Sequence, residues 1–135
     1  MTGGACVLAA AGALAAPASA QTTQTTQTTG VTIPAAFAGT WKGTATMSAI
    51  GVSAVSLKNS IAFTFVAGGR TAQENNQTCV NTLTLTGATA TALTFSEPQT
   101  AQCVAGMVTF TRQGASLAYH WTDNIEQNVA TLRKS

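Results

Sequence analysis

A two-residue alternation is the feature that most constrains this chain. From Thr40 to Ser48 every second residue is Thr, Lys or Ser, and the residues between them, beginning with Trp41, are apolar or small. Successive side chains of a strand point to opposite faces, so this stretch predicts a strand with one buried face and one solvated face. Similar segments follow, separated by turn signals such as Gly68-Gly69 and Gln113-Gly114, and predict about eight short strands in succession.

The strand segments and their connections can be placed along the sequence. We expect strands at residues 39–49, 55–57, 61–65, 82–86, 93–95, 108–112, 117–121 and 130–132. Lys58-Asn59 is predicted to be the turn of a hairpin, and the polar stretch at residues 70–78 is predicted to be a connecting loop. Gly87 is expected to end its strand in a turn.

Consecutive strands with one apolar face each have two main ways to bury that face. They can close into an up-and-down barrel or pack as a two-sheet sandwich. Closure also removes the edge strands through which a Thr-rich sheet would pair with other chains. We therefore predict an all-β fold, an antiparallel up-and-down barrel of about eight strands, with a β-sandwich as the alternative. The interior of such a barrel is filled by side chains or holds one small ligand.

Charge content limits the partners. Only 7% of the 135 residues are charged, the net charge is +2, and the six Lys and Arg residues are scattered along the sequence. We therefore expect no nucleic-acid binding. The single His, without clustered Cys or carboxylates, predicts no metal site, and we expect no cofactor.

The N-terminal residues predict export. Residues 1–20 form an apolar run that ends on Ala18-Ser19-Ala20, the small-x-small pattern of a signal-peptidase site. Residues 21–36 begin with three Gln-Thr-Thr units, which predict a disordered linker. The barrel domain is then expected at residues 37–135, in a protein that is secreted or lies on the periplasmic or outer side of the cell envelope. After signal cleavage we expect no stable membrane insertion.

Two cysteines remain once the signal is removed, Cys79 and Cys103. An even number of cysteines in an exported chain predicts a disulfide. The bridge would close a loop of roughly 25 residues, for which chain entropy gives about 3.5 kcal/mol of stabilisation.

The sequence offers little for catalysis. Ser116, His120 and Asp123 are the available members of a nucleophile triad, but Ser116 and His120 are separated by roughly 13 Å of extended chain. The four acidic residues show no spacing typical of a general acid and base, and Glu97, beside Pro98, is expected to end a strand in solvent. We therefore predict that the protein is not an enzyme.

A ligand site is expected, if one exists, at an open end of the barrel. Its candidate residues are Trp41, Arg112, Tyr119 and Trp121. Trp41 is expected mainly as a plug, because the apolar residues, Met47 and Leu57 included, have enough volume to fill most of a small barrel. Arg112 is expected to reach the barrel mouth as the polar partner of the aromatic rings.

The Gly-Thr-Trp-Lys-Gly opening at residues 39–43, the two cysteines and the spaced hydrophobic residues up to Arg133 form one pattern. It resembles small exported bacterial β-barrel domains, some free-standing and some attached outside the membrane to actinobacterial serine/threonine kinases. This resemblance covers residues 39–133. It implies a sensing or binding module, with no catalytic residues to carry over.

Two other families share part of this pattern. Lipocalins and avidins also begin with Gly-x-Trp, here Gly39 to Trp41, and the resemblance implies a ring that closes one barrel end. In lipocalins a late Arg packs across that ring, a position that Arg112 or Arg133 would take. Exported bacterial metalloprotease inhibitors are similar as well, which would make residues 30–41 an arm that enters a protease cleft.

These observations predict a monomeric, exported, non-enzymatic binding or sensing module. Its partner would be an envelope component, a protein or a small ligand. Two alternatives stay open: a secreted protease inhibitor that uses its N-terminal arm, and a lipocalin-like carrier of a small apolar ligand.

Overall fold

The computed structural model describes residues 30–51 and 57–135. The predicted signal at residues 1–20, the linker up to residue 29 and the predicted strand start at Val55 lie outside the described residues. The chain divides into two units, Met1–Gly30 and Val31–Ser135, and the second contains every strand of the described ranges. Within these ranges, no helix is long and apolar enough to cross a membrane.

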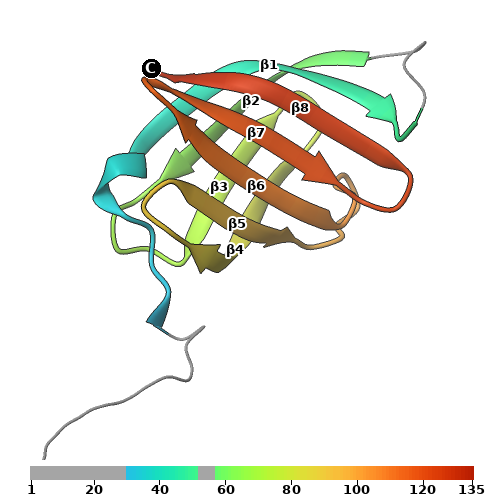
Figure 1. Cartoon of the computed structure of the whole chain (residues 1–135). Helices are drawn as coiled ribbons and strands as arrows, with labels where there is room; N and C mark the ends of the chain where they lie inside the picture. The colour runs from blue at the N-terminus through green and yellow to red at the C-terminus, as the bar shows by residue number, and fades with distance from the viewer. Residues whose placement is uncertain (1–29, 52–56) are drawn as a thin grey trace, which may run out of the picture. The chain divides into compact units, whose positions relative to one another are not determined.

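Val31–Ser135 forms one closed barrel of eight antiparallel strands (Figure 1). Each strand pairs with the next along the chain, and the last pairs back with the first. The strands are β1 (Gly39–Ala49), β2 (Leu57–Phe65), β3 (Thr71–Asn76), β4 (Val80–Ala88), β5 (Ala92–Glu97), β6 (Gly106–Gln113), β7 (Ser116–Thr122) and β8 (Glu126–Lys134). The predicted up-and-down barrel is confirmed, and the sandwich alternative is wrong.

Two of the predicted connections are wrong although the strand count is correct. Lys58 and Asn59 lie inside β2, where they pair with Thr46 and Ala45 of β1 instead of turning the chain. The supposed loop at residues 70–78 contains β3. That strand was missed because its buried positions are occupied by Ala72 and Glu74, which lack the large apolar side chains that mark a strand. One strand was divided and another overlooked, and the two errors cancel.

The expected turns hold at two sites and fail at a third. Gly68 and Gly114 lie in the β2–β3 and β6–β7 turns with φ angles of 79° and 63°, a region that glycine enters without strain. Gly87, by contrast, lies inside β4 beside a register shift, so it marks a bulge rather than a turn. The chain turns later, where the Thr89 N–H donates to the Ala92 carbonyl at 2.8 Å.

An aromatic cluster fills the middle of the barrel. Its rings come from four strands, and each pair in contact has centroids between 4.8 and 5.9 Å apart. Phe110 touches all four of the others, which are Phe63, Phe65, Phe95 and Tyr119. These five buried rings pack against one another in the core of the barrel.

The segment before β1 closes one end. Ile33 is 1% exposed, its N–H donates to the Gly69 carbonyl at 2.9 Å, and its own carbonyl accepts from the Gly68 N–H at 2.8 Å. A single 3-10 turn, η4 (Ala35–Phe37), then places the buried Phe37 over the core. The folded unit therefore begins at Val31 rather than at Phe37, and the end of the predicted linker belongs to the barrel.

The two ends of the barrel differ. The closed end carries η4, the β2–β3 turn and the C-terminus, to the left in Figure 1. The opposite end carries the β3–β4, β5–β6 and β7–β8 connections. At this end, inward-facing positions that could hold core side chains are occupied by buried polar residues, namely Glu74, Asn81, Glu97 and Asn128. We call this the disulfide end, because both cysteines lie in its loops.

Candidate functional site

A cavity of about 450 Å³ opens at the disulfide end. The two buried glutamates and Asn128 line it, together with the rings of Tyr119 and Trp121. Its size falls in the range of small-molecule sites. Its composition, a few convergent polar groups beside aromatic rings, is also that of such sites.

The strand alternation itself brings the polar groups into the barrel. Along β5 the buried residues are Leu93, Phe95 and Glu97, so Glu97 continues the inward face of two core residues. Glu74 follows Ala72 in the same way along β3, and Asn128 follows the inward face of β8. The inward face is thus apolar at the closed end and polar at the disulfide end.

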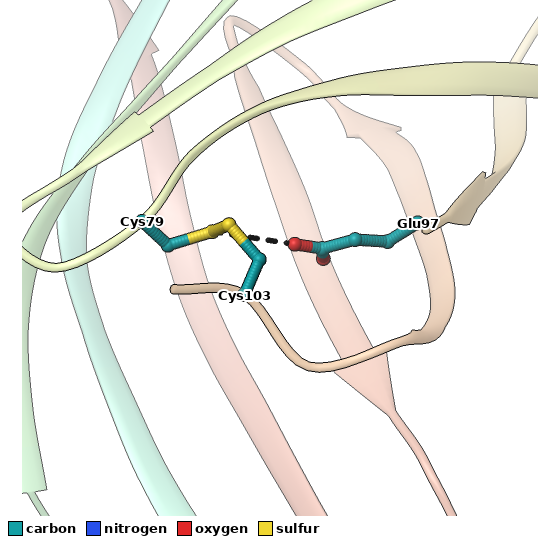
Figure 2. A group of neighbouring side chains, drawn as sticks. All are labelled: Cys79, Glu97 and Cys103. Carbon is teal, nitrogen blue, oxygen red and sulfur yellow. Dashed lines mark hydrogen bonds between the residues drawn. A yellow bond between two sulfur atoms is a disulfide. The ribbon is translucent and has the colours of Figure 1, made fainter. Parts of the chain in front are cut away.

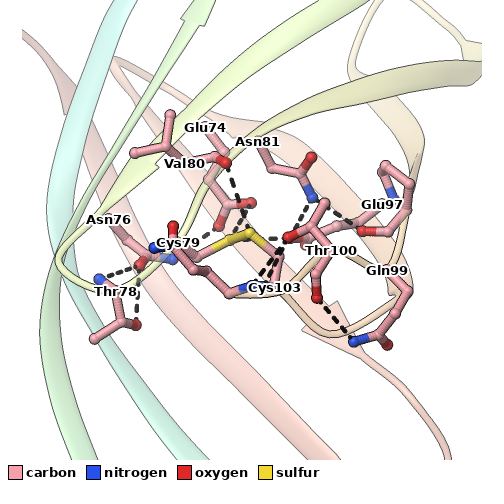
Figure 3. The surroundings of a disulfide bond; sticks show 12 residues. Glu74, Asn76, Thr78, Cys79, Val80, Asn81, Glu97, Gln99, Thr100 and Cys103 are labelled. Atoms are coloured by element: carbon pink, nitrogen blue, oxygen red, sulfur yellow. Dashed lines mark hydrogen bonds between the residues drawn. A yellow bond between two sulfur atoms is a disulfide. The ribbon is translucent and has the colours of Figure 1, made fainter.

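Glu74 and Glu97 form a buried carboxyl pair. They are 3% and 4% exposed, and each approaches the same atom of the bridge, Cys79 Sγ, with carboxyl oxygens at 3.8 and 3.4 Å. Figure 2 shows the Glu97 carboxyl group directed at the disulfide. Each carboxyl group of the pair accepts a hydrogen bond from an amide: Asn76 Nδ2 donates to Glu74 at 3.0 Å, and Asn81 Nδ2 donates to Glu97 at 3.3 Å (Figure 3).

The pair keeps a proton at neutral pH. Burial, followed by the hydrogen bond and the charge of Glu97, raises the pKa of Glu74 to about 9. Two carboxylates so close together in a low-dielectric site do not both ionise. The same effects raise the pKa of the Tyr119 phenol, through burial first and then the charges of Glu74 and Glu97. Tyr119 therefore stays neutral.

Asn128 presents an acceptor without a donor. The residue is 4% exposed. Its side chain hydrogen-bonds the Tyr119 phenol and so partly offsets the rise in the pKa of that phenol, while its Oδ1 has no hydrogen-bond partner among the described residues. A buried carbonyl oxygen without a partner is costly, and in native proteins it usually indicates a water, an ion or a ligand. Since Asn128 lines the cavity, a bound molecule would supply the missing donor.

The predicted disulfide between Cys79 and Cys103 is present and buried, with the two Cα atoms 5.2 Å apart. It ties the β3–β4 loop to the β5–β6 loop over the cavity. Thr100 shapes the second loop by accepting the Cys103 N–H on its Oγ1 at 3.0 Å. Both sulfurs and a Glu97 oxygen lie within 4.8 Å of one another, but sulfurs joined in a disulfide are not thiolate ligands, so this group does not suit a metal ion.

The structure divides the four candidate ligand residues into two pairs. Tyr119 and Trp121 line the cavity. Trp41 lies toward the closed end, where it is 4% exposed and its Nε1 donates to the Phe37 carbonyl at 2.8 Å. Arg112 is exposed near the same end, at the β6–β7 turn. Trp41 and Arg112 are therefore not part of the cavity.

Other expectations also need correction. The cation over the Trp41 ring is not Arg112 or Arg133 but Lys134, whose Nζ lies 5.1 Å from the ring centroid. Leu57 does not fill the barrel: it is 67% exposed at the cavity rim, and Met47 is only half-buried. The space expected to be filled by these two side chains is the cavity mouth.

The triad residues make no contact with one another. Ser116 Oγ donates to the Gln113 carbonyl at 3.0 Å, and His120, exposed as expected, contacts Gln127 Oε1 at 3.3 Å. Asp123 instead accepts two backbone N–H groups of its own turn at 2.7 Å.

Glu97 was expected in solvent, and that prediction is wrong. The neighbouring proline suggested a strand end, but the inward register of Leu93 and Phe95 already placed Glu97 inside. Glu74 had no such signal, because its strand was not recognised. No protein-family model matches this chain, and comparison with curated proteins found no match.

Proposed function

We propose that this domain is an exported, non-enzymatic binding module that holds a small ligand in the cavity at the disulfide end. The observation that carries the proposal is the unpartnered, buried Oδ1 of Asn128 in a cavity lined by Tyr119 and Trp121. A barrel that only needed to be stable would fill this space with apolar side chains, as the closed end does. The disulfide favours an oxidising compartment, and with the resemblance to small exported bacterial barrels it supports a secreted or periplasmic location.

The carrier alternative gains more support than the inhibitor alternative. An inhibitory arm at residues 30–41 would have to leave the barrel, yet Ile33 is buried and bonded to both glycines of the β2–β3 turn. The cavity, in contrast, is accessible from solvent past the exposed Leu57 and Val104. The ligand is expected to be amphipathic rather than purely apolar, because carboxyl and amide groups line the interior.

Binding is favoured over catalysis by the state of the polar groups. The amides nearest the carboxyl pair, Asn76 and Asn81, are already bonded to it, so they are not free to stabilise a developing anion. The other polar side chains of the lining are Glu126, amides, hydroxyls and the exposed Lys58. Among the described residues, none of them forms the nucleophile–base hydrogen bond that activates a nucleophile.

The two tryptophans of the sequence provide the test, since one lies in the cavity and the other toward the closed end. We would titrate the full ¹⁵N-labelled chain with a panel of small cationic, neutral and anionic molecules and follow the two indole N–H resonances. The proposal expects at least one molecule to shift the Trp121 resonance and leave that of Trp41 in place. A panel that never moves Trp121, or always moves both resonances alike, would contradict it.

A further inference from the structure

The cavity carries enough chemistry to indicate the class of its ligand. We propose that it binds a small organic ammonium ion, with the charged nitrogen between Glu74, Glu97 and Asn128 and the apolar part toward the mouth. This inference rests on the proposed function, because it names the ligand of the same cavity.

The interior presents acceptors. Glu74 and Glu97 contribute carboxyl oxygens, and Asn128 contributes an Oδ1 without a donor. A primary ammonium group has three N–H donors and no acceptor. The donor set of such a group therefore matches the three acceptor groups of the cavity, whereas a carboxylate or phosphate would meet oxygens of its own kind.

The charge inside the barrel is uncompensated. Five titratable groups line the cavity: Glu74 from β3, Glu97 from β5, Tyr119 from β7, Glu126 from β8 and Lys58 from β2. Lys58 is exposed at the rim, and no described Lys or Arg side chain lies within ion-pair distance of a described carboxylate. A pair that keeps one proton holds one negative charge, and a buried charge without a partner is costly. A cation supplies that partner.

The rings favour an organic cation over a metal ion. Tyr119 and Trp121 line the same space, and aromatic faces attract ammonium groups while offering no ligand atom to a hard metal. Met47, Leu57 and Val104 lie at the mouth, where Leu57 and Val104 are 67% and 51% exposed. An apolar tail that covers these side chains would be removed from water together with them.

Binding is expected to be linked to a proton. A cation placed beside the pair favours the ionised form of Glu74, so that its proton leaves to the buffer as the ligand enters. Affinity for an amine that remains protonated should therefore increase from about pH 6 to 8, by at most about tenfold per pH unit.

The test uses three probes of similar shape and different charge on the full chain: 2-phenylethylamine, 2-phenylethanol and 3-phenylpropanoate, with calcium chloride as an inorganic cation. Calorimetry gives the affinity, and the Trp121 indole resonance gives the site. We expect the amine to bind at least about tenfold more tightly than the alcohol, and the propanoate and calcium not to move Trp121.

Variants separate the roles of the two carboxyl groups. Removing both, with Glu74→Gln and Glu97→Gln together, is expected to weaken amine binding about tenfold to hundredfold. Glu74→Gln alone leaves one carboxylate and no proton to release, so it should lose the pH dependence and bind the amine less tightly than the parent at pH 8. Asp123→Asn is the matched control, since it removes one negative charge from an exposed turn outside the cavity and keeps the accepting oxygen.

The outcomes distinguish this inference from the proposed function. If the alcohol or the propanoate shifts Trp121 and binds as tightly as the amine, the cavity binds ligands but not through charge, and the ammonium inference is wrong. The same holds if calcium moves Trp121 and the amine does not. If none of the probes nor any molecule of the wider panel moves Trp121, both proposals fall. The three probes and calcium are compared on the parent chain, so they test the ammonium inference even if the double variant does not fold.

Discussion

Replacing Glu74 by Gln should change how the stability of the barrel depends on pH. The pKa of Glu74 is about 9 in the folded protein, against about 4.3 for an unperturbed glutamate. The folded state therefore keeps a proton that the unfolded chain releases between these two values. Stability from this group is complete below about pH 4 and is lost as the pH rises toward 9.

The magnitude can be worked out from the linkage between proton binding and folding. Inside this window each pH unit lowers the free energy of unfolding by somewhat more than about 1 kcal/mol, so about 3 kcal/mol disappears between pH 6 and 8. For a folded unit of about a hundred residues, that corresponds to a fall in Tm of roughly 10–20 °C. Gln has the shape of the protonated acid and no proton to lose, so Glu74→Gln should flatten this dependence and be more stable than the parent at pH 8.

Urea unfolding of the parent chain and Glu74→Gln at pH 6, 7 and 8 measures this difference. Asp123→Asn is the control. Its turn hydrogen bonds lower the pKa of the Asp123 carboxyl, so the group is ionised in both states over this range, and the variant should keep the parental slope. Equal slopes for the parent and Glu74→Gln, or a parent that gains stability with rising pH, would refute the buried-proton interpretation.

Three further predictions concern the framework of the cavity. Replacing both bridge cysteines by Ser should cost about 3.5 kcal/mol, because the bridge spans a sequence separation of 24 residues; the urea midpoint should fall, and an unchanged midpoint would contradict this. Gly106→Ala should cost about 1–3 kcal/mol and shift the Trp121 indole resonance, because a Cβ at this position would lie 2.6 Å from Trp121 Cε2. Gly87→Ala is the control: its Cβ would have no neighbour closer than 3.9 Å, so the Trp121 resonance should stay in place. Phe110→Ala should cost about 3–5 kcal/mol in thermal melts, because it removes the ring shared by the whole aromatic cluster, and a loss below about 1 kcal/mol would show that the core is not packed as described.

The architecture was predictable because alternation and turns act locally. The two-residue alternation correctly predicts the inward positions of Trp41, Phe63, Phe110 and Leu117. Closure of the barrel follows from the need to bury one face of every strand. The two cysteines left after the predicted signal, in a chain expected to be exported, predicted the bridge. β3 was not predicted because its inward-facing residues are Ala72 and Glu74 rather than large apolar side chains. Burial of these residues depends on the neighbouring strands and not on the β3 segment itself.

The cavity was only half predictable for a related reason. Tyr119 and Trp121 were recognised as inward-facing rings, and their position at the disulfide end agrees with a site at an open barrel end. The acidic pair was missed because a glutamate is rarely buried. Pro98 suggested an exposed strand end at Glu97, and this outweighed the inward register of β5. Glu74 and Glu97 lie on β3 and β5, on either side of β4, and their side chains meet inside the barrel over that strand, a contact that no spacing in the sequence reveals.

Ligand binding inside the barrel is tested most directly by intermolecular NOEs between 2-phenylethylamine and the full chain, which locate the bound molecule. We expect NOEs from the amine to ring protons of Tyr119 and Trp121, and none to Trp41, whose indole N–H is bonded to the Phe37 carbonyl toward the closed end. NOEs to Trp41 or to the outward-facing threonines, with none to Trp121, would place binding outside the cavity and contradict a ligand site at the disulfide end.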